Sequence, residues 1–355
     1  MRTPGWFEER DPGIARRALL APLLAPAWLY GLAATAARRL RSERFRAPAR
    51  LACRVLSVGN LGVGGSGKTP TAAWIAAQLR AAGHPVALAS RGYGRRGRDP
   101  VVVVSDGRFV RATMAEAGDE ALLLAAHAPG VPVLIGRDRA VVGLRAIAAF
   151  GADVLVLDDG FQHHRLARDL DLVCFDGAGL GNGHLLPRGP LREPLGALAQ
   201  ADGVLVVDGP LPAADEAAIR AAAPRAAWFT ARRRPVSLRP LAGGPALPPA
   251  ALAGQPVGLL AGIARPASLR RTLESIGARV VAARVFPDHH RYRERDLAGL
   301  AKEAARWVTT EKDAAKILPR FAGAADVRVL AIELAPDDPR GLLDWLERTL
   351  RAKRR

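Results

Sequence analysis

The chain has few of the residues that build disulfide frameworks or nucleic-acid stacking surfaces. Its 355 residues include only two cysteines, Cys53 and Cys174, and only 5% are aromatic. Both cysteines lie in apolar runs, so we expect no structural disulfide and a reducing compartment. Because aromatic side chains are scarce and no nucleic-acid-binding motif is present, we expect no nucleic-acid partner.

Acidic residues are also in deficit, with 34 Asp and Glu against 52 Lys and Arg, which gives a formal net charge of +18. Such an excess suits an anionic membrane surface or an anionic substrate. Only five of the basic residues are lysines, and the arginine bias of a GC-rich genome would produce part of the same excess. The hydrophobic content of 49% is typical of a globular protein with a core, and the length predicts two domains.

An uncharged stretch of twenty residues, 18–37, lies near the N-terminus between Arg16-Arg17 and Arg38-Arg39. Its length would allow a membrane span, but Pro22, Pro26 and Gly31 interrupt it. We favour a helix that lies on the bilayer, with a span, a signal peptide and a soluble packing helix as alternatives. The flanking arginines favour the cytoplasmic face of the membrane.

The most informative segment has the P-loop pattern G-x-x-x-x-G-K-[ST]. Its eight residues are Gly62, Val63, Gly64, Gly65, Ser66, Gly67, Lys68 and Thr69. A short apolar strand is predicted before it at 54–58 and a helix after it at 70–80, which is the context that a phosphate-binding loop requires. We expect the loop to bind a nucleotide, with Lys68 at the outer phosphates and the Thr69 hydroxyl on Mg²⁺.

Apolar runs alternate with helical patterns along most of the chain, which predicts a mostly parallel sheet covered by helices on both faces. The expected fold class is therefore α/β, a P-loop protein with a smaller second α/β domain. We expect an N-terminal apolar helix in 1–45, a nucleotide-binding domain in 46–231, a linker rich in Arg, Gly and Pro in 232–256, and the C-terminal domain in 257–355. A continuous helix is expected over 294–306.

Two carboxylates follow the apolar run 154–157. In P-loop proteins, a strand beside the loop ends in an acid that holds Mg²⁺. Asp158 is our candidate for this ligand, and Asp159 is expected to be a second carboxylate near the metal.

Several further motifs occur in a characteristic order. They are Gly64–Pro70, Ser90–Tyr93, Gly118–Glu120, Asp158–His163 (Asp-Asp-Gly-Phe-Gln-His), Gly189–Glu193, Phe286–His289 and Thr310–Asp313. In this combination the chain resembles the tetraacyldisaccharide 4'-kinases, also called lipid A 4'-kinases, over nearly its whole length.

The resemblance implies an enzyme that uses ATP and Mg²⁺ to phosphorylate the 4'-hydroxyl of a tetraacylated glucosamine disaccharide 1-phosphate in lipid A biosynthesis. It implies the cytoplasmic face of the bacterial inner membrane, an anionic glycolipid substrate and no obligate protein partner. From sequence alone, Asp119 could equally be a helix cap; the resemblance implies that it is the catalytic base and that His289 pairs with it across the cleft. Asp288 is a plausible hydrogen-bond partner that orients the His289 ring. The neighbouring His290 leaves open which of the two imidazoles belongs to the active site.

Cationic and polar residues are expected around the acceptor. Arg91 and Tyr93 follow a predicted strand, near the edge of the sheet where such sites form; Arg95 and Arg96 could equally be a solvated turn. Gln162 and Arg192 are further candidates for contact with the acceptor, and Glu193 could order the metal surroundings. Loops that bind guanine have a Lys and an Asp separated by one residue. Lys312 and Asp313 are adjacent, so we expect ATP rather than GTP.

Two other functions remain as alternatives. A membrane-associated P-loop ATPase switch of the partitioning type would carry an extra lysine at the position of Val63. A soluble P-loop kinase of a small metabolite would have no use for the apolar N-terminal segment.

Overall fold

The computed structural model describes residues 4–11, 13–43, 47–322 and 325–353. The chain forms two compact units: a larger one, Thr3–Arg232 with Leu334–Arg355, and a smaller one that contains Arg233–Glu333. The chain therefore leaves the larger unit once and returns to it. Two long strands, β8 (Ala227–Pro240) and β12 (Asp326–Pro336), carry it out and back.

The larger unit is built around a mostly parallel sheet with the strand order β12-β8-β7-β6-β1-β5-β2-β4-β3. β3 is antiparallel to β4, whereas β4, β2, β5, β1, β6, β7 and β8 pair in parallel. The strands not yet given bounds are β1 (Arg54–Gly59), β2 (Val86–Ser90), β3 (Val102–Asp106), β4 (Pro132–Ile135), β5 (Val154–Asp158), β6 (Leu170–Asp176) and β7 (Gly203–Val207).

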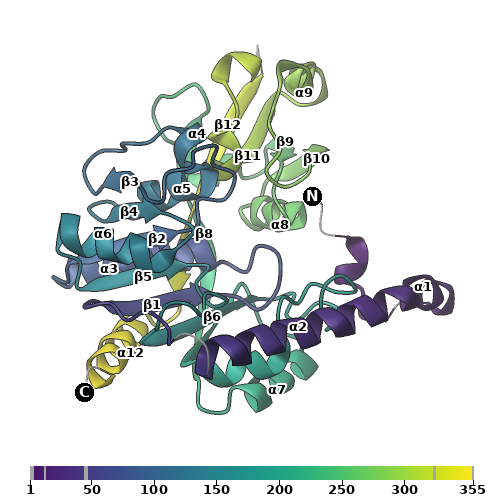
Figure 1. The fold of residues 1–355 in the computed structure, drawn as a ribbon. Helices are drawn as coiled ribbons and strands as arrows, with labels where there is room; N and C mark the ends of the chain where they lie inside the picture. The colour runs from purple at the N-terminus through teal and green to yellow at the C-terminus, as the bar shows by residue number, and fades with distance from the viewer. Residues whose placement is uncertain (1–3, 12, 44–46, 323–324, 354–355) are drawn as a thin grey trace. The chain divides into compact units, whose positions relative to one another are not determined.

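Helices cover both faces of this sheet (Figure 1). The helices of the larger unit are η1 (Gly5–Phe7), α1 (Ile14–Leu20), η2 (Ala21–Leu23), α2 (Leu24–Glu43), α3 (Lys68–Ala81), α4 (Met114–Ala117), α5 (Asp119–His127), α6 (Arg139–Phe150), η3 (Leu195–Gln200), α7 (Ala213–Ala222) and α12 (Pro339–Ala352). Successive side chains of a strand point to opposite faces, so Leu56 of β1 packs with α3 whereas Val55 joins the cluster of α6.

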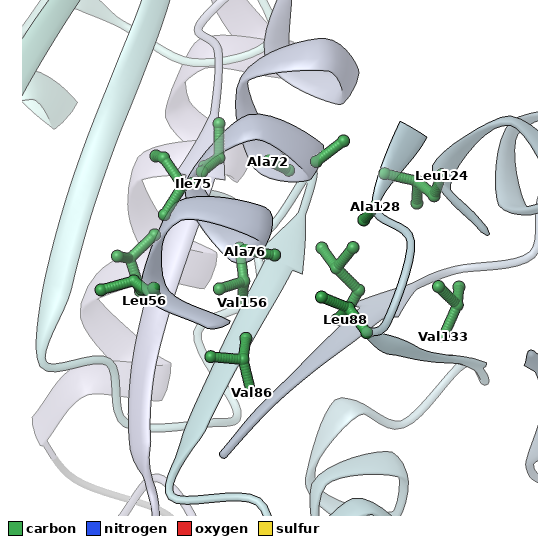
Figure 2. Close-up of a cluster of buried hydrophobic side chains, with 14 of the residues drawn as sticks. Leu56, Ala72, Ile75, Ala76, Val86, Leu88, Leu124, Ala128, Val133 and Val156 are labelled. Carbon is green, nitrogen blue, oxygen red and sulfur yellow. The ribbon is translucent and has the colours of Figure 1, made fainter. Parts of the chain in front are cut away.

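The core beneath α3 consists of aliphatic side chains from neighbouring strands. Figure 2 shows Ile75 and Ala76 of α3 above Leu56, Val86 and Val156 of the sheet. The same cluster contains the apolar stripe of α12, so the last helix belongs to the larger unit rather than to the expected C-terminal domain 257–355. Its apolar positions recur every fourth residue, which is the spacing of one helix face.

The smaller unit has the strand order β10-β9-β11-β12-β8, and the pairs β10–β9, β9–β11 and β11–β12 are parallel. Its remaining elements are η4 (Pro249–Leu252), β9 (Pro256–Ala261), α8 (Pro266–Ser275), β10 (Arg279–Val285), α9 (Glu294–Leu297), α10 (Leu300–Glu303), β11 (Arg306–Thr310), α11 (Glu311–Ala314) and η5 (Pro319–Ala322).

Two local expectations differ from the structure. The first part of the segment expected as a linker, 232–256, is extended as part of β8. The helix expected over 294–306 is two short helices, because Gly299 adopts a φ of +78° and caps α10. A residue in this left-handed region ends a continuous helical hydrogen-bond pattern.

Candidate functional site

The glycine loop connects the end of β1 to the start of α3, as the motif predicts. Gly64 and Gly67 have φ values of +117° and +84°, which favour glycine. A Cβ on Gly67 would lie 3.1 Å from Val207 Cγ2, whereas a Cβ on Gly65 would meet no heavy atom of the described residues within 4 Å. The loop is therefore packed at its helix end and open at Gly65, as a phosphate cradle must be.

A second segment, 177–193, supports this loop from the side. The Val63 N–H donates to the Pro190 carbonyl at 2.8 Å, and the Arg192 N–H donates to the Leu61 carbonyl at 2.8 Å. These bonds hold the glycine loop to the segment that carries Arg192.

The other end of this support segment holds the N-terminus of the described chain. Asn182 donates from its backbone N–H to the Phe7 carbonyl at 2.7 Å and from its side chain to the Trp6 carbonyl at 2.9 Å. Arg10 pairs with Asp215, which also accepts the Leu180 N–H at 2.7 Å.

Helix α2 also meets this segment. A Cβ added to Gly31 would lie 2.6 Å from Leu185 Cδ1. Burial raises the pKa of Tyr30, and the charges of Arg192 and Glu193 also act on its hydroxyl. The apolar N-terminal helix is thus in contact with the segment that supports the glycine loop.

Thr69 and Asp158 form the candidate magnesium site. Thr69 Oγ1 lies 3.3 Å from both carboxylate oxygens of Asp158, the last residue of β5. Asp158 is only 2% exposed, and burial, reinforced by the charge of Glu120, raises its pKa to about 7 against the effect of Lys68. A bound cation would favour the ionised carboxylate, so this buried acid fits a metal ligand.

The described residues hold no group of three or more His, Cys, Asp or Glu side chains that could bind a metal by themselves. Mg²⁺ keeps several waters and takes one or two carboxylates together with substrate phosphates, and Asp158 beside Thr69 would supply such a carboxylate.

Asp159 is held by Arg192. The guanidinium donates two hydrogen bonds to the carboxylate, at 3.0 Å from Nη1 and 2.9 Å from Nη2. Although burial opposes it, the charges of Lys68 and Arg192 hold the pKa of Asp159 below its usual range. Arg192 also donates to both the carbonyl and the side-chain oxygen of Asn60, so Asp159, Arg192 and the start of the loop form one network.

Gln162 joins the same network. Its side-chain amide donates to the Asn60 carbonyl at 2.9 Å and to Glu193 Oε2 at 3.4 Å, and His164 Nε2 lies 3.2 Å from Glu193 Oε1. These contacts give Gln162 and Glu193 a part in holding the loop; contact of Gln162 with the acceptor stays a prediction.

Asp119 begins α5 in the same unit and is 6% exposed. Its Oδ1 accepts the Glu120 N–H at 3.0 Å. The preceding Gly118 has a φ of +82°, and a Cβ there would collide with the Tyr93 carbonyl oxygen, so the start of α5 lies against the turn that follows β2. The structure therefore brings Asp119 next to this turn, which carries Arg91 and Tyr93, whose side chain is 61% exposed.

Arg139, at the start of α6, is a buried cation near the candidate site that the sequence did not indicate. It is 4% exposed, and its guanidinium interacts electrostatically with Asp158, Asp159 and Arg91. Burial, together with the charge of Arg91, lowers its pKa. The pattern Arg-Asp-Arg after a strand predicts only a charged turn, because burial of its last residue depends on the tertiary packing.

His289 lies in the smaller unit with a φ of +59°. Lys312 Nζ is 3.2 Å from His289 Nε2 and 3.2 Å from Asp288 Oδ1, and Asp288 Oδ2 is 3.7 Å from His289 Nε2. Because Asp119 and His289 belong to different units, their pairing stays a prediction.

His290 has a different environment. Its ring stacks on Phe286 at a centroid distance of 4.5 Å and meets Tyr292 edge-on at 5.0 Å, and its Nε2 lies 3.0 Å from Asp296. These contacts make His290 part of the packing of the loop, which favours His289 as the functional imidazole.

A family model described as tetraacyldisaccharide-1-P 4'-kinase (LpxK) matches residues 17–351. The tetraacyldisaccharide 4'-kinase of Anaeromyxobacter sp. (strain Fw109-5) is 47% identical over 347 residues, covering 95% of this chain and 92% of the relative. That of Methylobacterium sp. (strain 4-46) is 42% identical over 358 residues, covering 99% of each. Among solved structures, LpxK from Aquifex aeolicus in complex with ATP superposes with a TM-score of 0.74 at 29% identity, covering 94% of this chain and 99% of that one.

Proposed function

The chain belongs to the tetraacyldisaccharide 4'-kinase family, and we propose how its own residues carry out the reaction of that family. The reaction is the ATP-dependent phosphorylation of the 4'-hydroxyl of a tetraacylated glucosamine disaccharide 1-phosphate in lipid A biosynthesis. The observation that carries the proposal is the Thr69 hydroxyl, 3.3 Å from both Asp158 oxygens at the end of an open glycine loop.

The nucleotide is assigned to residues 62–69. Backbone N–H groups of the loop and the N-terminus of α3 would bind the phosphates, and the Lys68 ammonium would neutralise the transferring group. Thr69 and Asp158 would hold Mg²⁺, with Asp159 close by and oriented by Arg192. When bound, the metal supplies charge neutralisation to the phosphates.

Asp119 is assigned as the general base. It would accept the proton of the 4'-hydroxyl while the oxygen bonds to the terminal phosphorus and the bond to the bridging oxygen of ADP breaks. We assign to His289 the role of orienting Asp119 or sharing its proton.

Arg91, Tyr93, Gln162 and Arg192 are proposed to face the acceptor. The substrate is a glycolipid with a 1-phosphate, and an anion needs cations and hydrogen-bond donors. Support for this assignment comes from the position of Arg91 and Tyr93 on the turn against which Asp119 is held.

We also propose that α1 and α2 attach the enzyme to the cytoplasmic face of the inner membrane, against its inner leaflet. Residues 14–36 form a helical segment apolar and long enough to cross a membrane, with 17% of its apolar window buried. Large apolar side chains project from it: Ile14 is 87% exposed, Leu19 77% and Trp28 66%. An amphipathic or apolar helix with such a surface binds lipid, and flanking arginines favour anionic headgroups.

The enzymatic assignment is tested with γ-labelled ATP, Mg²⁺ and the disaccharide 1-phosphate in mixed micelles. We expect label on the lipid, with Lys68→Ala and Asp119→Asn each lowering the rate by about 10²- to 10⁴-fold. Lys302→Ala, which removes an exposed lysine of α10, is the control and should keep full activity. ATP hydrolysis without transfer to the lipid, or near-normal rates for either active-site variant, would contradict the assignment.

Membrane attachment is tested separately by flotation with vesicles that contain anionic phospholipid. Leu19→Ser with Trp28→Ser should weaken flotation, because burial of apolar surface in the bilayer is lost. The control is Val141→Ser with Leu144→Ser, an exposed apolar pair on α6. Equal flotation of the first variant and the wild type would count against the proposed surface.

A further inference from the structure

Lys312 contacts the side chains of both His289 and Asp288. Its ammonium lies 3.2 Å from His289 Nε2 and 3.2 Å from Asp288 Oδ1. An ammonium has three donors and no acceptor. In a hydrogen bond across this contact Lys312 is therefore the donor and Nε2 the acceptor, which leaves the ring proton on Nδ1.

The backbone at Lys312 is held by hydrogen bonds of neighbouring residues in the smaller unit. The next residue, Asp313, is fully buried and accepts the Gly262 N–H at 3.0 Å and the Thr310 hydroxyl at 2.9 Å. The Thr310 hydroxyl also accepts the Asp313 N–H at 3.1 Å, which caps α11. The four residues 310–313 thus form a hydrogen-bonded turn from which the lysine extends.

The loop that carries His289 is fixed as well. The Asp288 side chain accepts the His289 N–H at 3.0 Å, and the ring packing of His290 between Phe286 and Tyr292 secures the following residues. The left-handed backbone of His289 is held between these two anchored positions. Lys312 and Asp288 therefore act on an imidazole whose backbone is already placed.

We propose that Lys312 is a positioning residue that holds His289 as the neutral Nδ1–H tautomer, so that His289 offers a hydrogen-bond donor to the catalytic carboxylate. The proposal rests on the role given to His289 above. A donor on Nδ1 suits a carboxylate partner such as Asp119, because an ionised carboxylate only accepts hydrogen bonds. The proposal also gives a role to Lys312, which the proposed reaction does not otherwise use.

The tautomer is measured by ¹⁵N NMR of the full-length enzyme labelled on its histidine rings, with the His289 signals identified through His289→Gln. In the wild type, we expect Nε2 of His289 to have the shift of an unprotonated nitrogen and Nδ1 that of a protonated one. In Lys312→Ala the Nε2 signal should move towards the protonated value, whereas Lys302→Ala should leave it unchanged. An unchanged His289 spectrum in Lys312→Ala would overturn the proposal.

Steady-state kinetics provide the second test. Lys312→Ala should lower kcat about 10- to 100-fold, because a small misplacement of a reacting group has an effect of that order, and KM for ATP should stay within about twofold. Lys312→Arg should recover part of the loss, because it restores a cationic donor. In a His289→Ala background, Lys312→Ala should add no further loss.

The outcomes separate the possible failures. A raised KM for ATP with kcat intact would make Lys312 a phosphate-binding residue and overturn the proposal, as would additive losses in the double variant. A wild-type enzyme without transfer to the lipid would refute the proposed function alone, because the tautomer measurement needs no turnover.

Discussion

Arg192 binds both carboxylate oxygens of Asp159, at 3.0 and 2.9 Å, and the same guanidinium reaches Asn60 at the start of the glycine loop. One side chain therefore links an acid beside the metal site to the backbone that precedes the phosphate cradle. Two parallel bonds fix the plane of the carboxylate as well as its position.

We predict that Arg192→Lys lowers kinase activity about 10- to 100-fold and raises the Mg²⁺ concentration needed for half-maximal rate. Lysine keeps the charge but cannot form the two-pronged contact, and a charge-assisted hydrogen bond contributes about 1.5–3 kcal/mol. Magnesium titrations of the initial rate measure both effects. Arg168→Lys is the control, because Arg168 Nε binds both oxygens of Asp171 in a more deeply buried pair outside the site; an equal change in its Mg²⁺ requirement would refute the prediction.

The two loop glycines should respond differently to alanine. Gly67→Ala forces a left-handed φ on alanine and places its Cβ 3.1 Å from Val207, so unfolding should become easier by about 1–2 kcal/mol. A Cβ on Gly65 would meet no described atom within 4 Å, so stability should change by less than about 0.5 kcal/mol. ATP affinity should fall, because the added methyl group would occupy open space that the proposed function assigns to the phosphates. Thermal unfolding and nucleotide titration separate the two. Unimpaired ATP binding by Gly65→Ala would mean that phosphates do not occupy this side of the loop.

His163 should make the fold sensitive to acid. Burial, with the charge of Arg139, lowers its pKa from 6.5 to about 4. The unfolded chain therefore binds a proton below pH 6.5 that the folded protein accepts only near pH 4, so stability present at neutral pH is lost as pH falls through this window. The loss should be roughly 1–2 kcal/mol, allowing for partial exposure of the ring.

The measurement is urea unfolding at pH 7.5 and pH 5. Between these two values, the free energy of unfolding should fall less for His163→Gln than for the wild type. If both proteins lose the same amount, another group is responsible for the acid sensitivity.

Replacement of the two adjacent histidines should affect different properties. His290→Ala should lower the free energy of unfolding by roughly 1–3 kcal/mol, because it removes a ring packed between two aromatic side chains, with kcat changed by less than about twofold. His289→Ala should leave stability nearly unchanged and lower kcat substantially. Chemical unfolding and initial rates on the same samples test this, and the reverse pattern would identify His290 as the functional imidazole.

The sequence allowed the glycine loop, its flanking strand and helix, and the family to be predicted, because these signals lie in contiguous residues. The position of Asp158 at the end of a strand was predictable for the same reason, because a short apolar run ends at this carboxylate. Arg139 was missed because its burial depends on packing between segments far apart in the chain. The two contacts of Lys312 were likewise invisible, since they join residues more than twenty positions apart.

The boundary between the units was also hard to predict. The Arg-Arg-Arg-Pro stretch at 232–235 resembles a linker in composition, yet it continues strand β8. The apolar stripe of α12 predicts a helix with one buried face, but not which sheet it packs against. Local pattern determines the element, whereas its partner depends on the path of the whole chain.

The contact of Asn182 with Phe7 and Trp6 changes how a shortened enzyme must be interpreted. The segment 177–193 meets the N-terminal helices on one side and the glycine loop on the other. Removing residues 1–43 would take away helices that contact the support segment 177–193 as well as the proposed membrane attachment. A drop in turnover after such a truncation would therefore not show that the enzyme needs contact with the bilayer. A form of the enzyme that is soluble without detergent is better sought by polar substitutions at Ile14 and Leu19.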